Sequence, residues 1–306
     1  MCTREERTSR ATGAAFGTTP LPPHPIVDPK DDEELQRVKT WLLSRPSPLH
    51  ELLATAVMDT LDYVLDGAYT GRFYLLDKRV DSGERALVGT KLEYRVLKQL
   101  ELQKQPPLDT RVEGVSVDIK NTIRSSWMIP TECQCEICLL VRIDATNDRF
   151  SASLMRTHRI LLGGRNKDGK RGTPKASVER YSVPLFHELW APLPRNPLRN
   201  LSDDQIADVF HPKHGQTRRF TALFGYLPRT VISRRALATV GFDNDDPLRR
   251  VRQAREHVLK EHNLVLLCGK WPVQREAAAT LGHTLGPTDW VALPSTPELV
   301  SIMKQK

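Results

Sequence analysis

Two carboxylates and a lysine lie close together in the middle of the chain, in a pattern that could bind a metal ion and act on a phosphate. Asp109 precedes Asp118 by nine positions (118 − 109), and Lys120 follows with one residue between. Apolar and polar residues alternate over 115–119, which predicts a strand with Asp118 and Lys120 on one face. Carboxylates suit Mg²⁺, which polarises a scissile phosphate, and a nearby lysine can stabilise the developing charge or orient the attacking water.

A third carboxylate comes from a helix that the sequence predicts just upstream. From Thr90 apolar residues recur at helical spacing beside Glu93, until Pro106 ends the pattern. A D-x-K triplet alone is common, and it could simply belong to a solvated strand face. Its order after a helical glutamate and a further aspartate, however, resembles that of the PD-(D/E)xK nuclease superfamily. We therefore expect Mg²⁺ bound by Glu93, Asp109 and Asp118, and a catalytic set of Glu93, Asp109, Asp118 and Lys120.

The elements that must position these residues are predicted as helices followed by strands. Helices are expected over 31–44, from Ser47 until Gly67 and from Thr90, and strands over 112–120, 137–143 and around 150–162. This order predicts an α/β (α+β) fold, with a mixed sheet covered by helices as in restriction endonucleases of that superfamily. We assign residues 31–183 to this endonuclease domain. Residues 1–30, rich in Thr, Pro and Gly, are expected to form a disordered arm.

A second domain is predicted after a proline-rich linker over 184–198. Residues 199–306 are expected to form a winged-helix-like DNA-binding domain with helices over 202–210, 216–224, 233–240 and 247–262, then a strand over 264–268. The helices at 233–240 and 247–262 resemble a helix-turn-helix with Gly241 at the break. Gly269 to Trp271 would follow the strand like a wing.

Basic side chains concentrate in this second half of the chain. The formal net charge is +8, the sequence pI is about 9.3, and arginines gather around the predicted helix-turn-helix. Such residues can reach phosphates and base edges of duplex DNA, although a solvated helix face would look the same. The candidate DNA-binding residues are Arg234, Arg235, Arg249, Arg250, Arg252, Gln253, Arg255 and Lys270.

The cysteines allow a second, weaker metal hypothesis. Cys133, Cys135 and Cys138 have a spacing at which thiolates can share zinc, but a fourth ligand is not evident and buried free thiols are at least as common. Five cysteines, an odd number, and no secretory signal favour a cytoplasmic location. No run of apolar residues approaches the length needed to span a membrane, so no membrane partner is expected.

Four strings extend the resemblance to one family of type II restriction endonucleases, the NaeI type. They are TLDYVLDGAYTGR (60–72), KLEYRVLKQLE (91–101), PLDTRVEGVSVDIKNT (107–122) and SWMIPTE (126–132). The resemblance covers residues 45–165 well and the second half more loosely. It implies that Glu93, Asp109, Asp118 and Lys120 are the catalytic residues. It also implies a homodimer that cuts double-stranded DNA at a short, GC-rich palindrome.

The same resemblance implies that the second domain binds another, activating copy of the site. The family also has a stretch similar to the active site of DNA ligases, with a lysine two residues before Asp-Gly. Here Val64 stands at that position before Asp66, so the nucleophile is missing and the stretch is expected to be a helix end. Two rivals stay open: a DNA-binding regulator with a decayed nuclease domain, and a nicking nuclease of repair or mobile elements.

Overall fold

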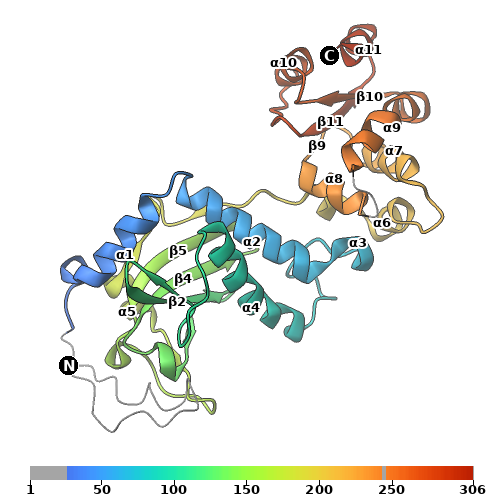
Figure 1. Ribbon diagram of the computed structural model, residues 1–306. Coiled ribbons are helices and arrows are strands. Elements are labelled where there is room, and N and C mark those ends of the chain that lie inside the picture. The colour runs from blue at the N-terminus through green and yellow to red at the C-terminus, as the bar shows by residue number, and fades with distance from the viewer. Residues whose placement is uncertain (1–25, 243–245, 306) are drawn as a thin grey trace. The chain divides into compact units, whose positions relative to one another are not determined.

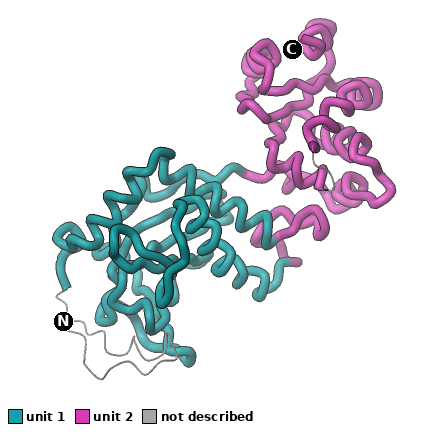
Figure 2. Tube along the Cα trace, viewed as in Figure 1, with its two compact units in different colours: residues 1–64, 80–194 teal, residues 65–79, 195–306 magenta. Residues whose placement is uncertain are grey.

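A computed structural model describes residues 26–242 and 246–305, and the chain divides into two units (Figures 1 and 2). The first contains residues up to 64 and 80–194, and the second contains residues 65–79 and 195–306. Residues 1–25 of the predicted arm lie outside the described residues. Among the described residues, no helix is both long and apolar enough to cross a membrane.

The first unit is built on a mixed sheet with strand order β1-β2-β4-β5-β7. Strand β2 pairs with β4 in parallel, whereas the other neighbours are antiparallel, and β8 also pairs with β5. A separate small ribbon joins β3 to β6. The strands are β1 (Thr110–Val112), β2 (Val115–Thr122), β3 (Met128–Ile129), β4 (Ile137–Asp144), β5 (Arg149–Arg156), β6 (Arg171–Gly172), β7 (Ser182–Pro184) and β8 (Ala191–Pro192).

Helices flank this sheet, which confirms the predicted mixed α/β organisation (Figure 1). Helix α4 packs against β2, and α1 packs against β5. The helices are α1 (Glu33–Leu43), α2 (Leu49–Leu65), α4 (Ser82–Gln99) and α5 (Lys175–Tyr181), with 3₁₀ turns η1 (Pro29–Asp31), η2 (Thr131–Cys133) and η3 (Arg159–Leu161).

A buried ion pair attaches the start of α1 to the sheet. Asp32 caps α1 by accepting from the Leu35 N–H, and it also accepts two hydrogen bonds from Arg156 of β5, at 2.6 and 2.9 Å. Both side chains are buried, and burial of a charge is tolerated only when it is paired in this way. The capping residue therefore fixes both where α1 begins and which strand it contacts.

The predicted start of α4 at Thr90 was wrong. The helix begins at Ser82, because Asp81 and Glu84 form a reciprocal capping box that satisfies two backbone N–H groups. The apolar stripe accordingly starts earlier, at the buried Val88. Strand β5 likewise ends at Arg156 rather than near residue 162.

The second unit combines helices with a small antiparallel sheet of order β10-β11-β9. Its strands are β9 (Val231–Ile232), β10 (Leu264–Cys268) and β11 (Trp290–Pro294). Its helices are α3 (Gly67–Thr70), α6 (Asp203–Val209), α7 (Gln216–Tyr226), α8 (Arg234–Val240), α9 (Pro247–His262), α10 (Pro272–Thr280) and α11 (Pro297–Lys304), with a 3₁₀ turn η4 (Pro197–Asn200).

Every residue of β10 is buried, because apolar clusters cover both faces of this sheet. The turn after β10 leads into α10, whereas the sequence was interpreted as a simple wing at Gly269 to Trp271. Pro272 at the first helical position and the alanines that follow favour this helix.

Residues 65–79 belong to the second unit although they lie between α2 and α4 in the sequence (Figure 2). Phe73 is part of the second unit's core and stacks on Phe210 at 5.8 Å. Arg199 lies over the ring of Tyr74 at 3.8 Å. Gly67 must be glycine, since a Cβ there would lie 2.4 Å from the Phe73 ring. Helix α2 ends at Leu65, which confirms that the ligase-like stretch is a helix end.

Candidate active site and nucleic-acid interface

The register of β1 and β2 brings two of the expected catalytic carboxylates together. Thr110 pairs with Val117, so Asp109, one residue earlier, lies beside Asp118, one residue later. Asp109 is held there because its Oδ2 accepts a 2.7 Å hydrogen bond from the Ile119 N–H. Both aspartates are buried. The convergence expected from the hairpin is therefore present.

Glu93 approaches the same place from α4, which packs against β2. Its side chain forms an ion pair with Lys104, whose Nζ is also 3.7 Å from Asp109 Oδ1. Burial raises the pKa of Glu93, Lys104 opposes this shift, and the charge of Asp109 adds to it. Sequence reasoning missed Lys104, because it lies on the loop between α4 and β1, outside any periodic pattern.

Asp118 and Lys120 lie on the same face of β2, with Lys120 Nζ 2.5 Å from Asp118 Oδ2. Burial raises the pKa of Asp118 to about 7, Lys120 opposes this shift and Asp109 reinforces it. The neighbouring Cys133 side chain also opposes the rise in the pKa of Asp118. Burial raises the pKa of Cys133 well above its usual value.

The pKa values of Glu93 and Asp118 are both raised by burial and, to a smaller extent, by the nearby charge of Asp109. A cation among Glu93, Asp109 and Asp118 would relieve the repulsion between these carboxylates, so the chemistry of the donor set fits a hard divalent metal. Within residues 26–242 and 246–305, however, no three His, Cys, Asp or Glu side chains are close enough together to hold one ion. The same holds for Cys133, Cys135 and Cys138, so the zinc hypothesis gains no support there.

Helix α9 carries most of the expected DNA-binding residues, and most are exposed. Arg249 and Arg250 are exposed near its start, and Arg250 donates to Gln253 Oε1 at 2.9 Å. Arg252 lies 3.7 Å from Asp246. The other candidates lie on neighbouring elements, Arg234 and Arg235 in the first turn of α8 and Lys270 in the turn after β10.

Arg255 differs from these residues, because its guanidinium is engaged within the unit. It donates to Gln274 Oε1 at 2.9 Å and to the Met303 carbonyl at 3.0 Å. It also lies over the rings of Trp271 and Trp290, 4.7 and 4.9 Å from their centroids. Burial lowers its pKa to about 10. The sequence contains a signal for this, since Arg255 falls at helical spacing with the buried residues 251, 254 and 258.

A basic hollow adjoins the exposed face of α9. It is lined by Gly215 to Arg218 at the start of α7 and by Arg250 and His257 of α9, and its volume is about 800 Å³. Glu261 occupies part of its rim and pairs with Arg218 at 2.7 Å. Sequence reasoning did not single out Arg218.

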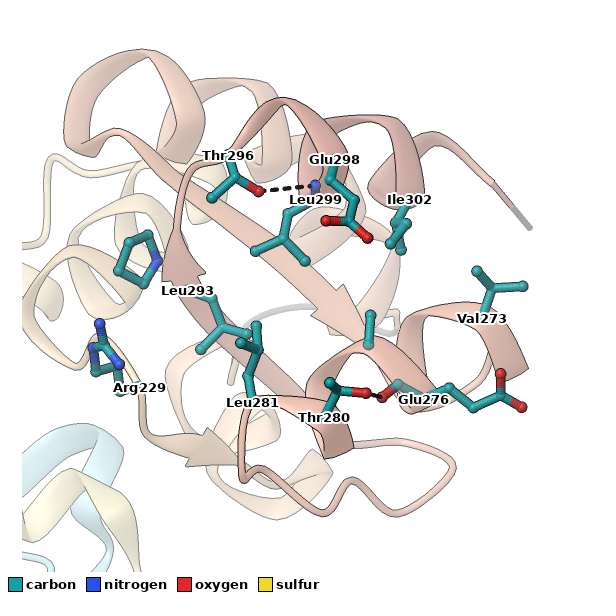
Figure 3. Close-up of a pocket in the computed structure, with 12 residues that line it drawn as sticks. Arg229, Val273, Glu276, Thr280, Leu281, Leu293, Thr296, Glu298, Leu299 and Ile302 are labelled. Carbon is teal, nitrogen blue, oxygen red and sulfur yellow. Dashed lines mark hydrogen bonds between the residues drawn. The ribbon is translucent and has the colours of Figure 1, made fainter.

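A second pocket, of about 530 Å³, lies between α10, α11 and β11 (Figure 3). Leu281, Leu293 and Leu299 point toward one another inside it, and its charged residues are Arg229, Glu276 and Glu298. Apolar walls and two carboxylates do not complement a phosphate backbone. The lining of this pocket therefore does not favour DNA binding.

Comparison with known proteins identifies the family. The family model described as restriction endonuclease NaeI matches residues 37–302, which include both units and all four expected catalytic residues. The chain belongs to the NaeI family of restriction endonucleases. It is 28% identical to the type II restriction enzyme NaeI of Lentzea aerocolonigenes over 253 residues, which cover 79% of this chain and 77% of that enzyme. Membership of the NaeI family makes the chain a nuclease of the restriction type.

Proposed function

We propose that this protein is a Mg²⁺-dependent type II site-specific endonuclease that hydrolyses both strands of duplex DNA. The observation that carries the proposal is the β1–β2 register, which sets Asp109 beside Asp118 with Lys120 on the same face. Glu93, Asp109 and Asp118 would hold Mg²⁺. When bound, that ion would polarise the scissile phosphate and neutralise charge on it.

The chain's own residues prepare this chemistry. Asp109 is fixed by the Ile119 N–H, and Asp118 is paired with Lys120, so both carboxylates have restricted orientations before DNA binds. Lys120 is held at Asp118, from where its ammonium can orient a water or contact a phosphate oxygen. Burial of the aspartates excludes bulk water and strengthens each of these interactions.

The second unit is proposed to bind DNA as a winged-helix domain. The order α7, β9, α8, α9, β10, followed by the inserted α10 and then β11, with β11 between the other two strands, supports this proposal. Helix α9 would enter the major groove with Arg249, Arg250, Arg252 and Gln253, while Arg234, Arg235 and Lys270 would reach phosphates. The contacts of Arg255 favour a role in packing instead.

Cleavage of both strands requires two catalytic centres, and the described residues contain one such carboxylate cluster, so a homodimer is proposed. By resemblance to the family, the site is a GC-rich palindrome and the second unit binds an activating copy of it. In domain terms, residues 31–183 would be the endonuclease, 184–198 the linker and 199–306 the DNA-binding part, to which residues 65–79 contribute.

Digestion of a sequenced genomic DNA with purified protein and Mg²⁺, followed by sequencing of the ends, tests the proposal. Discrete double-strand breaks at one short sequence are expected, and EDTA should abolish them. Single-strand nicks would indicate a nicking nuclease instead. Tight DNA binding without any cleavage, over a range of divalent metals, would indicate a regulator.

A further inference from the structure

A second lysine, Lys104, contacts two of the three carboxylates that are proposed to hold the metal. Its ammonium forms an ion pair with Glu93 and is 3.7 Å from Asp109 Oδ1. A divalent metal shared by these carboxylates would lie about 2.0–2.6 Å from an oxygen of each. The ammonium and the metal therefore cannot occupy this place together.

The loop that carries Lys104 is fastened on both sides of it. The Gln103 carbonyl accepts from Thr110 Oγ1 at 2.8 Å, and the Gln105 N–H donates to the Asp109 carbonyl at 3.0 Å. The backbone at Lys104 is thus tied to the strand that begins next to Asp109. These backbone hydrogen bonds consequently help to hold Lys104 beside the carboxylates.

We propose that Lys104 is a resident substitute for the metal, which neutralises Glu93 and Asp109 in the metal-free enzyme and must be displaced when a divalent cation binds. The inference rests on the proposed function. Lys104 would then be a positioning residue with two effects. Without metal it compensates the charges of Glu93 and Asp109 and so stabilises the fold around them, and it lowers the apparent affinity of the protein for metal.

Displacement is feasible because the Lys104 side chain is 41% exposed. A lysine can rotate its flexible stem into solvent, and here the Tyr94 ring, 5.1 Å from its Nζ, also lies beside it. Lys120 differs, since its side chain is only 23% exposed and is paired to Asp118. When a metal binds, Lys120 would therefore remain at the reaction centre, whereas Lys104 would leave it.

Mn²⁺ binding to the full-length protein, measured by electron paramagnetic resonance of the free ion, tests this inference without relying on cleavage. Lys104→Met should bind Mn²⁺ roughly fivefold more tightly than wild type, the factor expected for losing a competing, partly exposed ion pair. Lys104→Arg retains the charge and should resemble wild type. Lys98→Met removes an exposed lysine of α4 and serves as the matched control.

A thermal melt gives an independent measurement. Without metal, Lys104→Met should melt below wild type because its carboxylates repel each other uncompensated, and Mn²⁺ should raise its melting temperature by more than that of wild type. Suppose that wild type binds Mn²⁺ and that Asp118→Asn abolishes this binding. If Lys104→Met then binds Mn²⁺ no more tightly than wild type, the inference is overturned while the proposed function stays intact. If wild type binds no Mn²⁺ up to millimolar concentration, the proposed metal site fails as well.

Discussion

Replacement of Arg255 by methionine should destabilise the second unit without removing a DNA contact. The change deletes two hydrogen bonds from a charged donor, to Gln274 and to the Met303 carbonyl, and the contacts with Trp271 and Trp290. Gln274 Oε1 still accepts from the Cys268 N–H at 3.0 Å, so it is not left without a partner.

The magnitude follows from these contacts. Charge-assisted hydrogen bonds contribute about 1.5–3 kcal/mol each and a desolvated cation–π contact up to about 2 kcal/mol. The methionine stem retains part of the packing, and the desolvation penalty of the guanidinium disappears. We therefore expect the free energy of unfolding to fall by about 2–4 kcal/mol.

Urea unfolding, followed by tryptophan fluorescence, measures this loss, because Trp271 and Trp290 both adjoin Arg255. Arg250→Ala is the matched variant on the exposed face of α9, and it should leave stability nearly unchanged while reducing DNA affinity and the slope of its salt dependence. The reasoning would be refuted if Arg255→Met kept full stability, or if it reduced the salt slope of DNA binding as Arg250→Ala does.

The buried Asp32–Arg156 pair of the first unit and the Phe73 ring in the core of the second unit should both contribute to stability. Burial opposes the charge of Asp32, but Arg156 and the Leu35 N–H outweigh it and lower its pKa. The pair therefore stabilises the first unit at pH values above the pKa of an unfolded aspartate and loses this effect as the pH falls through the folded value, so Asp32→Asn should flatten stability against pH in acid titrations. Phe73→Ala should destabilise the second unit by about 3–5 kcal/mol in urea unfolding, since that ring lies in its core. If Phe73→Ala lowered the stability of the first unit alone, the assignment of Phe73 to the second unit would be contradicted.

Local patterns predicted a large part of the fold. The period-two alternation over 115–119 correctly indicated the face shared by Asp118 and Lys120, and the cap at Ser202 and the proline at 247 located α6 and α9. The start of α4 was missed because its capping box precedes the apolar stripe that the interpretation relied on.

Non-local features could not be read in the same way. The position of Lys104 depends on hydrogen bonds between a loop and β1, and the inclusion of Phe73 in the second unit depends on packing against residues more than a hundred positions away. Arg255 was assigned to DNA by its charge, although its place on the buried side of α9 was visible in the helical spacing.

Asp118 and Lys120 are proposed to perform the chemistry and not to provide the affinity for DNA. Cleavage and binding by Asp118→Asn and Lys120→Met should therefore be compared on one duplex that contains the cut site, with gel shifts carried out in Ca²⁺ and Lys98→Met as control. Cleavage should fall by roughly 10²–10³-fold or more, while the dissociation constant for DNA stays close to that of wild type. Cleavage that survives either substitution, or DNA binding that is lost in step with it, would contradict this assignment.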